Sequence, residues 1–166
     1  MKSWRPRWPK RCMLLAVLSL AALLWTGSAF AQTSGAIAIV THPDTRVDDV
    51  TFLELRKIFL GEQQFWSDRT RVILLVRAPV AYERDVVLNR IYQMREAQFR
   101  QYWVAKVFRA EVSSGPKIVY STDMARQLLA ALPGAVAFVA ARDVSPEMKV
   151  LRINGKLPGD SDYPLQ

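Results

Sequence analysis

The feature that most constrains the fold is a strand-length run, Arg71 to Val76, in which five apolar residues follow one another. A half-exposed strand alternates apolar and polar residues, so this run is typical of a strand covered on both faces. Other segments rich in apolar residues lie at 36–40, 117–120, 135–140 and 149–153, and amphipathic stretches lie between most of them. We therefore predict a single α/β domain with a mostly parallel sheet flanked by helices.

The clearest helix start is at Thr51. Thr51 and Glu54 have the spacing of a capping box, in which each of the two side chains accepts a hydrogen bond from the other residue's backbone N–H. Gly61 is placed to end this helix, because glycine readily adopts the left-handed conformation that follows a last helical turn. The sequence predicts a helix over 51–60.

Three more helices are expected further along the chain. Apolar residues recur at helical spacing over 83–92 and over 97–108. The residue that caps the last of these helices is expected to be Thr122 or Asp123, and Pro133 is expected to stop it.

The first 31 residues differ in kind from the rest. Five basic residues and no acidic one precede an apolar run at 13–25, and the small residues of Ala29-Phe30-Ala31 follow it. This order is typical of a secretory signal peptide. A membrane anchor is the alternative, but 13 apolar residues cover only about 20 Å of a hydrocarbon core of about 30 Å. We expect cleavage before Gln32, a periplasmic location and no membrane span after cleavage.

The strongly basic charge belongs largely to this leader. Without residues 1–31, the 23 Lys and Arg fall to 18 against 15 Asp and Glu, so the net charge falls from +8 to +3. A nucleic-acid partner is therefore not expected. Cys12 also lies in the leader, which excludes disulfides and thiol chemistry from the mature chain. We expect residues 32–154 to form the domain and residues 155–166 to form a loose tail.

The mature chain lacks the residue patterns of common enzymes. It has one histidine, His42, and no G-x-S-x-G, zinc-ligand or phosphate-loop motif. His42 precedes a proline in an expected loop, where a solvated or packed histidine is more common than a base or ligand. We therefore expect no catalysis, no cofactor and no metal.

The residues proposed for a binding site follow the expected strands. In open α/β sheets, ligands bind beyond the carboxyl ends of the strands. The first strand leads to Thr41, the second to Arg77, and the third to Ser121 and Thr122. An arginine at such an end offers two parallel donors to phosphate or carboxylate oxygens. The alternatives are a solvated strand end for Arg77 and ordinary helix caps for Ser121 and Thr122.

Basic residues are frequent along the helix expected at 97–108, namely Arg95, Arg100, Lys106 and Arg109. Such a series is usually a solvated face. It also suits docking of an acidic partner.

Three segments together indicate a family resemblance: LELRKIFLG at 53–61, QFRQYW at 98–103 and PGAVAFV at 133–139. The chain resembles small periplasmic proteins related to the substrate-binding component of phosphate ABC transporters, over 37–153. The resemblance implies a type II periplasmic-binding-protein-like fold, of which this chain supplies about one lobe. It also implies a small anion such as phosphate as ligand, and an ABC permease or another envelope protein as partner.

One motif of that family is missing. In the phosphate receptors, the strand that resembles 71–77 leads into a G-S-G-T stretch that binds phosphate, whereas this chain continues with APVAYE at 78–83. Only Arg77 matches the family's binding residues at this place. The alternative function is therefore an envelope interaction protein that keeps the fold and has lost the ligand.

Overall fold

Five strands form the central sheet, in the order β4-β3-β5-β1-β6. The computed structural model describes residues 35–166, so the expected signal peptide and its cleavage site lie outside the described residues. The strands are β1 (Ile37–Thr41), β3 (Ile73–Arg77), β4 (Lys117–Val119), β5 (Ala135–Ala140) and β6 (Lys149–Val150).

The prediction of a mostly parallel sheet is confirmed. Strand β3 pairs in parallel with both β4 and β5, whereas β1 pairs antiparallel with β5 and with β6. Four strands therefore point one way and β1 points the other way. A separate parallel pair joins β2 (Asp49–Val50) to β7 (Arg152–Ile153).

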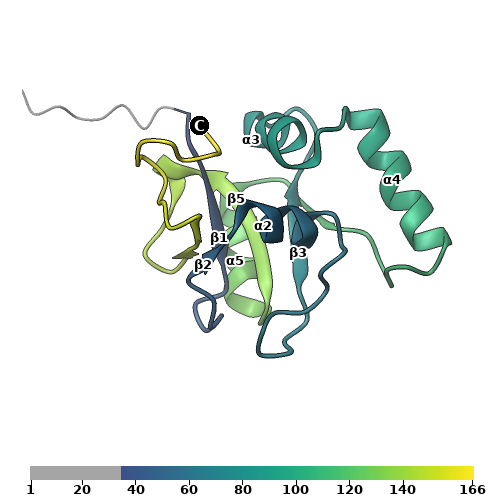
Figure 1. The fold of residues 1–166 in the computed structure, drawn as a ribbon, viewed down its shortest axis with the longest axis horizontal. Helices are drawn as coiled ribbons and strands as arrows, with labels where there is room; N and C mark the ends of the chain where they lie inside the picture. The colour runs from purple at the N-terminus through teal and green to yellow at the C-terminus, as the bar shows by residue number, and fades with distance from the viewer. Residues whose placement is uncertain (1–34) are drawn as a thin grey trace, which may run out of the picture. The chain divides into compact units, whose positions relative to one another are not determined.

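Helices cover both faces of the sheet (Figure 1). One face packs against α2 (Phe52–Phe59), α4 (Glu96–Phe108) and the segment before α4, and the other packs against α5 (Thr122–Ala131). Every residue of β1 and β5 is consequently buried. No helix among residues 35–166 is long and apolar enough to cross a membrane.

The helix expected over 83–92 has two parts. It begins as α3 (Tyr82–Val87) and continues as one turn of π-helix at Leu88–Tyr92, which Gln93 ends with a φ of 55°. The cap expected for α5 also differs by one residue. Ser121 is the cap, and its hydroxyl accepts a hydrogen bond from the backbone N–H of Met124 at 3.0 Å.

The predicted start of α2 is confirmed. The Thr51 hydroxyl accepts from the Glu54 backbone N–H at 3.1 Å, and the Glu54 carboxylate accepts from the Thr51 backbone N–H at 2.8 Å. Gly61 follows the helix with a φ of 66°, and a Cβ there would lie 2.8 Å from the Trp103 ring. Only glycine fits both the conformation and the contact.

The PGA segment joins α5 to the sheet. Gly134 has a φ of 81°, and a Cβ at this position would collide with the Arg71 carbonyl. Its own carbonyl accepts from the Trp66 indole at 2.9 Å and from the Ile73 backbone N–H at 3.1 Å. Gly134 therefore helps to position the start of β3 beside the start of β5.

The expectation of a loose C-terminal tail is wrong. Tyr163 and Leu165 are buried, and the Ile37 backbone N–H donates to the Leu165 carbonyl at 2.8 Å. The Tyr163 hydroxyl donates to the Ile37 carbonyl at 2.8 Å. The two buried side chains and these two hydrogen bonds hold this polar segment beside β1.

Candidate ligand site at the carboxyl end of β3

Arg77 is the last residue of β3, and its neighbour across the sheet is Val119, the last residue of β4. Ser121 and Thr122 follow β4 directly and begin α5. Because β3 and β4 are parallel, their carboxyl ends meet at one edge of the sheet. The structure therefore brings Arg77, Ser121 and Thr122 to the same edge, as the sequence predicts.

Thr41 does not lie at this edge. It ends β1, which runs antiparallel, so it pairs with Val136 near the start of β5. Its side chain is fully buried, and its hydroxyl lies 3.5 Å from the Lys149 carbonyl. The expectation that the first strand ends beside Arg77 is wrong, because apolar periodicity does not determine the direction of a strand.

The Arg77 guanidinium is largely buried and only partly satisfied. Its Nε lies 4.0 Å from a carboxylate oxygen of Glu83, and the two side chains are 14% and 13% exposed. Among the described residues, Nε and Nη1 of Arg77 have no hydrogen-bond partner. Buried donors without a partner are destabilising, so most proteins do not leave them in this state. An oxygen of a small anion that reached either donor would supply the missing acceptor.

A second arginine fixes this end of β3. Arg84 on α3 is buried, donates to both carboxylate oxygens of Glu96 at 2.8 and 3.0 Å, and donates to the Arg77 carbonyl at 2.5 Å. Its guanidinium also lies 4.7 Å from the centre of the Phe99 ring. Arg84 therefore ties β3, α3 and α4 together. This pair cannot be found from the sequence, since no spacing rule links residues on two different helices.

The chain between Arg77 and α3 is strained. Val80 has a φ of 72° and is almost fully exposed. A β-branched residue rarely adopts this conformation. Ala81 then begins α3 without any side-chain cap. The α5 start on the same edge is conventional, because the Ser121 hydroxyl caps it.

The chemistry at this edge suits binding. Within residues 35–166, no group of three His, Cys, Asp or Glu side chains is placed to hold a metal ion. His42 lies outside this edge, in the loop after β1, where its Nδ1 accepts from the Asp44 backbone N–H at 3.1 Å. A guanidinium beside hydroxyl groups offers donors that suit the oxygens of an anion.

Comparison with solved structures identifies the fold. An ABC-type phosphate transport receptor from Vibrio cholerae matches at 18% identity and a TM-score of 0.61, covering 75% of this chain and 48% of the receptor. This chain has the fold of phosphate-type substrate-binding proteins. A putative phosphate ABC transporter substrate-binding protein with bound phosphate from Clostridium perfringens matches at 15% identity and a TM-score of 0.60, over 75% and 47%.

PstS from Borrelia burgdorferi is similar at 17% identity and a TM-score of 0.61, with 79% of this chain and 54% of PstS covered. The chain thus spans about half the length of these substrate-binding proteins. The resemblance noted in the sequence is confirmed in the fold. No protein-family model and no curated protein matches the sequence.

Proposed function

We propose that this chain is a periplasmic solute-binding protein that binds a small anion, first of all phosphate, at the carboxyl end of β3. One observation carries the proposal: two buried guanidinium donors of Arg77 lack a partner among the described residues. The likeness to proteins named as phosphate receptors supports phosphate as the anion. The alternative, an interaction protein without a ligand, is not favoured by these neighbours.

In this proposal the Arg77 guanidinium donates to the anion, and the hydroxyls of Ser121 and Thr122 donate to the same anion. Glu83 limits which anions are accepted, because its carboxylate lies 4.0 Å from Nε of Arg77. A fully ionised anion such as sulfate meets only repulsion from it. Phosphate still carries a proton near neutral pH, so its O–H group can donate a hydrogen bond to the Glu83 carboxylate. We therefore expect phosphate to bind more tightly than sulfate.

Calorimetry with inorganic phosphate tests the role of Arg77. Arg77→Ala removes a charge-assisted contact, so it is expected to weaken binding by about 1.5 to 3 kcal/mol. Arg77→Lys recovers part of this loss, because an ammonium lacks the planar pair of donors. Arg142→Ala is the matched control, since it removes an equal charge at an exposed side chain. Equal affinity in wild type, Arg77→Ala and Arg142→Ala would contradict the proposal.

Glu83→Gln tests the same site in the opposite direction. Removing the negative charge beside Arg77 is expected to increase the affinity for sulfate and to reduce the preference for phosphate. Unchanged affinities for both anions would show that the ligand does not approach Glu83.

The isolated chain is expected to bind weakly. In a receptor with two lobes, closure of the lobes strips water from the ligand. An anion held at one open edge keeps much of its hydration, and each contact is then weak. We expect a Kd of about 0.1 to 1 mM, equivalent to about 4 to 5.5 kcal/mol. A sub-micromolar Kd for a chain shown to be monomeric by sedimentation would refute this expectation.

Export and transport complete the proposal. The expected signal peptide directs the chain to the periplasm, where an ABC permease is its proposed partner and no catalysis is expected. The mass of the protein recovered from the periplasm tests this step. A chain that begins at Gln32 supports it, and an uncleaved chain recovered with membranes contradicts it.

A further inference from the structure

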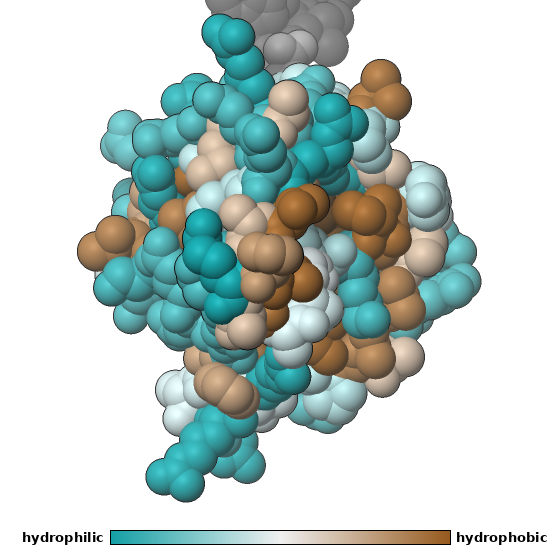
Figure 2. Space-filling model, turned by 90° about the vertical axis from the view of Figure 1, so that its right-hand side faces the viewer, coloured by the Kyte–Doolittle hydropathy of each residue, from teal (hydrophilic) through white to brown (hydrophobic). Residues whose placement is uncertain are grey.

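The helix α4 is apolar on two sides. Phe99 and Trp103 on one side are buried in the core, whereas Val104 and Phe108 on the other side are 69% and 90% exposed. Val107 is exposed beside them, and residues three and four apart share one face of a helix. Figure 2, which looks at the side where α4 lies in Figure 1, shows apolar side chains gathered there within hydrophilic surroundings.

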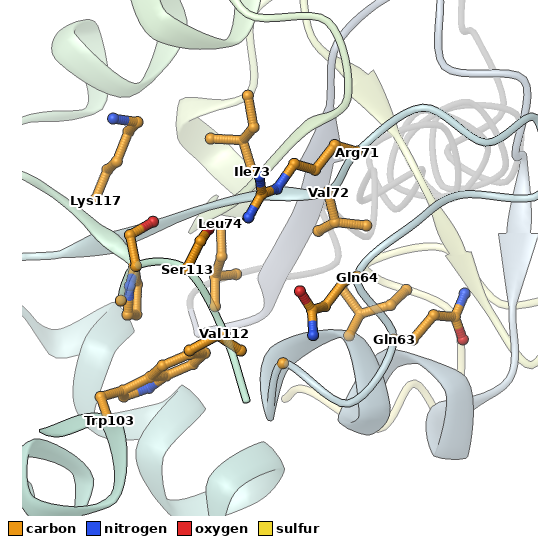
Figure 3. A pocket seen from close by; sticks show the side chains of 15 residues that line it. Gln63, Gln64, Arg71, Val72, Ile73, Leu74, Trp103, Val112, Ser113 and Lys117 are labelled. Carbon is orange, nitrogen blue, oxygen red and sulfur yellow. Dashed lines mark hydrogen bonds between the residues drawn. The ribbon is translucent and has the colours of Figure 1, made fainter. Parts of the chain in front are cut away.

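A pocket of about 250 Å³ adjoins this face, near the start of β3 and therefore away from Arg77. Figure 3 shows the Trp103 ring and Val112 at one side of the pocket and Arg71 across from them. Trp103 and Gly115 border both the pocket and the exposed face of α4. Pocket and helix face are thus one continuous surface, which we call the α4 surface. It comprises Arg71, Trp103, Val104, Val107, Phe108, Val112 and Lys117.

The rim of the α4 surface is basic. Arg71 and Lys117 line the pocket together with Ser113, and none of its lining residues is acidic. Arg71 donates to the Ser113 hydroxyl. Neither Arg71 nor Lys117 lies within 4.0 Å of a carboxylate of the described residues, and the same holds for Arg100, one turn before Val104.

Glu111, which adjoins Val112 of this surface, is already engaged. Glu111 accepts from Arg109 at 2.5 Å and lies 3.2 Å from the Lys106 ammonium. Hydrogen bonds from Arg109 and Lys106 lower the pKa of Glu111, so this carboxylate stays ionised and paired. It is therefore not free to neutralise Arg71, Arg100 or Lys117.

We propose that the α4 surface docks a segment of another protein in which an apolar side chain is flanked by Asp or Glu. The apolar side chain enters the pocket beside Trp103, and the acidic residues meet Arg71, Lys117 and Arg100. An apolar anchor in a pocket with a charged rim is how many protein interfaces concentrate their affinity. This docking is separate from anion binding at Arg77, which lies at the other end of β3.

Two other occupants fit less well. A small molecule that fills the pocket leaves the exposed faces of Val104 and Phe108 uncovered. A second copy of this chain brings the same basic rim with it, and like charges across an interface are unfavourable. The charge of the rim therefore selects an acidic partner.

Selection from a random peptide library displayed on phage, with the purified chain as bait, tests the proposal. Enriched peptides are expected to combine an aromatic or aliphatic anchor with Asp or Glu. A synthetic peptide of the enriched sequence is then titrated against each variant. Phe108→Ser and a double Arg71→Ala, Lys117→Ala variant are each expected to weaken it about tenfold or more. The effect of the double variant is expected to shrink as salt is added.

Two variants serve as matched controls. Leu53→Ser replaces an apolar residue that is 63% exposed on α2, and Arg142→Ala removes a charge elsewhere. Both are expected to bind the peptide as wild type does, and circular dichroism confirms that every variant is folded. Peptides without acidic residues, or peptide binding that Phe108→Ser leaves unchanged, would overturn the proposal. A dimer in sedimentation that Phe108→Ser dissociates would overturn it too, because the surface would then belong to a second copy.

Discussion

Helices α2 and α3 begin in opposite ways. The start of α2 is capped, because Thr51 and Glu54 accept hydrogen bonds from each other's backbone N–H. The start of α3 has no side-chain cap at Ala81 and follows a left-handed Val80. It also lies beside two donors of Arg77 that have no partner within residues 35–166. One helix start is optimised for stability, and the other is not.

This difference supports the site proposed at Arg77. Backbone strain and unsatisfied polar groups persist only where the surrounding structure holds them, and they concentrate at binding sites. At the start of α3, the surrounding structure is the Arg84–Glu96 pair, which joins β3 to α3 and α4. The comparison therefore predicts that Arg84 stabilises the domain and that Arg77 contributes mainly to binding.

The largest effect is expected from Glu96→Ala. It leaves the Arg84 guanidinium buried without its carboxylate. Removing one partner of a buried ion pair costs about 3 to 5 kcal/mol, and the lower end of this range is expected because Glu96 is 33% exposed. Urea unfolding measures this loss. Glu147→Ala is the control, because it breaks an exposed ion pair with Arg126 and is expected to cost less than about 1 kcal/mol. Equal losses in the two variants would mean that Arg84 does not hold the α3 start in place.

The next effect is expected at the α2 start. Thr51→Ala removes the side-chain acceptor of the capping box, so it is expected to lower the free energy of unfolding by about 1 kcal/mol. Thr51→Ser keeps the hydroxyl and is expected to restore most of the loss. An unchanged urea midpoint for Thr51→Ala, at the same m-value, would show that the capping box does not stabilise α2.

Local signals allowed much of this fold to be predicted. The capping box fixes the start of α2 within four residues of sequence, and the apolar run at 135–140 matches β5 residue for residue. Arg77 could be placed at a strand end for the same reason. Each of these features depends on neighbours in the chain, which a single sequence displays.

Features that depend on distant partners could not be predicted. The direction of β1, which takes Thr41 away from Arg77, depends on its pairing with β5. The Arg84–Glu96 pair joins two helices, and Leu165 packs beside β1 from the far end of the chain. Apolar periodicity shows which residues are buried, but it does not show against what they pack.

A smaller effect is expected from relieving the strain before α3. A left-handed conformation costs a residue with a Cβ about 1 to 2 kcal/mol, and glycine avoids this cost. Glycine, however, loses more backbone entropy on folding, which costs about 0.5 to 1 kcal/mol. Val80→Gly is therefore expected to stabilise the domain by roughly 0.5 kcal/mol, by the difference of these two terms. Its side chain is exposed, so no packing is lost. A destabilised Val80→Gly variant in urea unfolding would show that the strain is not stored at this residue.

The smallest effect is expected from the charge of Glu54, which is fully exposed to solvent. The hydrogen bond from the Thr51 backbone N–H lowers the pKa of Glu54, and Lys57 contributes in the same direction. The unfolded chain then binds a proton more readily than the folded chain, so folding is favoured above the ordinary glutamate pKa of about 4.3. This stability is lost as the pH falls through the lowered pKa of the folded state.

Glu54→Gln keeps the geometry of the capping box and removes the charge, because glutamine also fits this position. The wild type is therefore expected to be more stable than Glu54→Gln at pH 7, and the gap is expected to close as the pH falls below about 4. Thermal unfolding of both proteins from pH 7 down to about pH 3 measures the gap. The α3 start has no side-chain cap at Ala81, so it has no capping box in which the same exchange could be made. A gap that stays constant with pH would mean that the start of α2 gains nothing from the charge, and that the two helix starts differ only in their neutral hydrogen bonds.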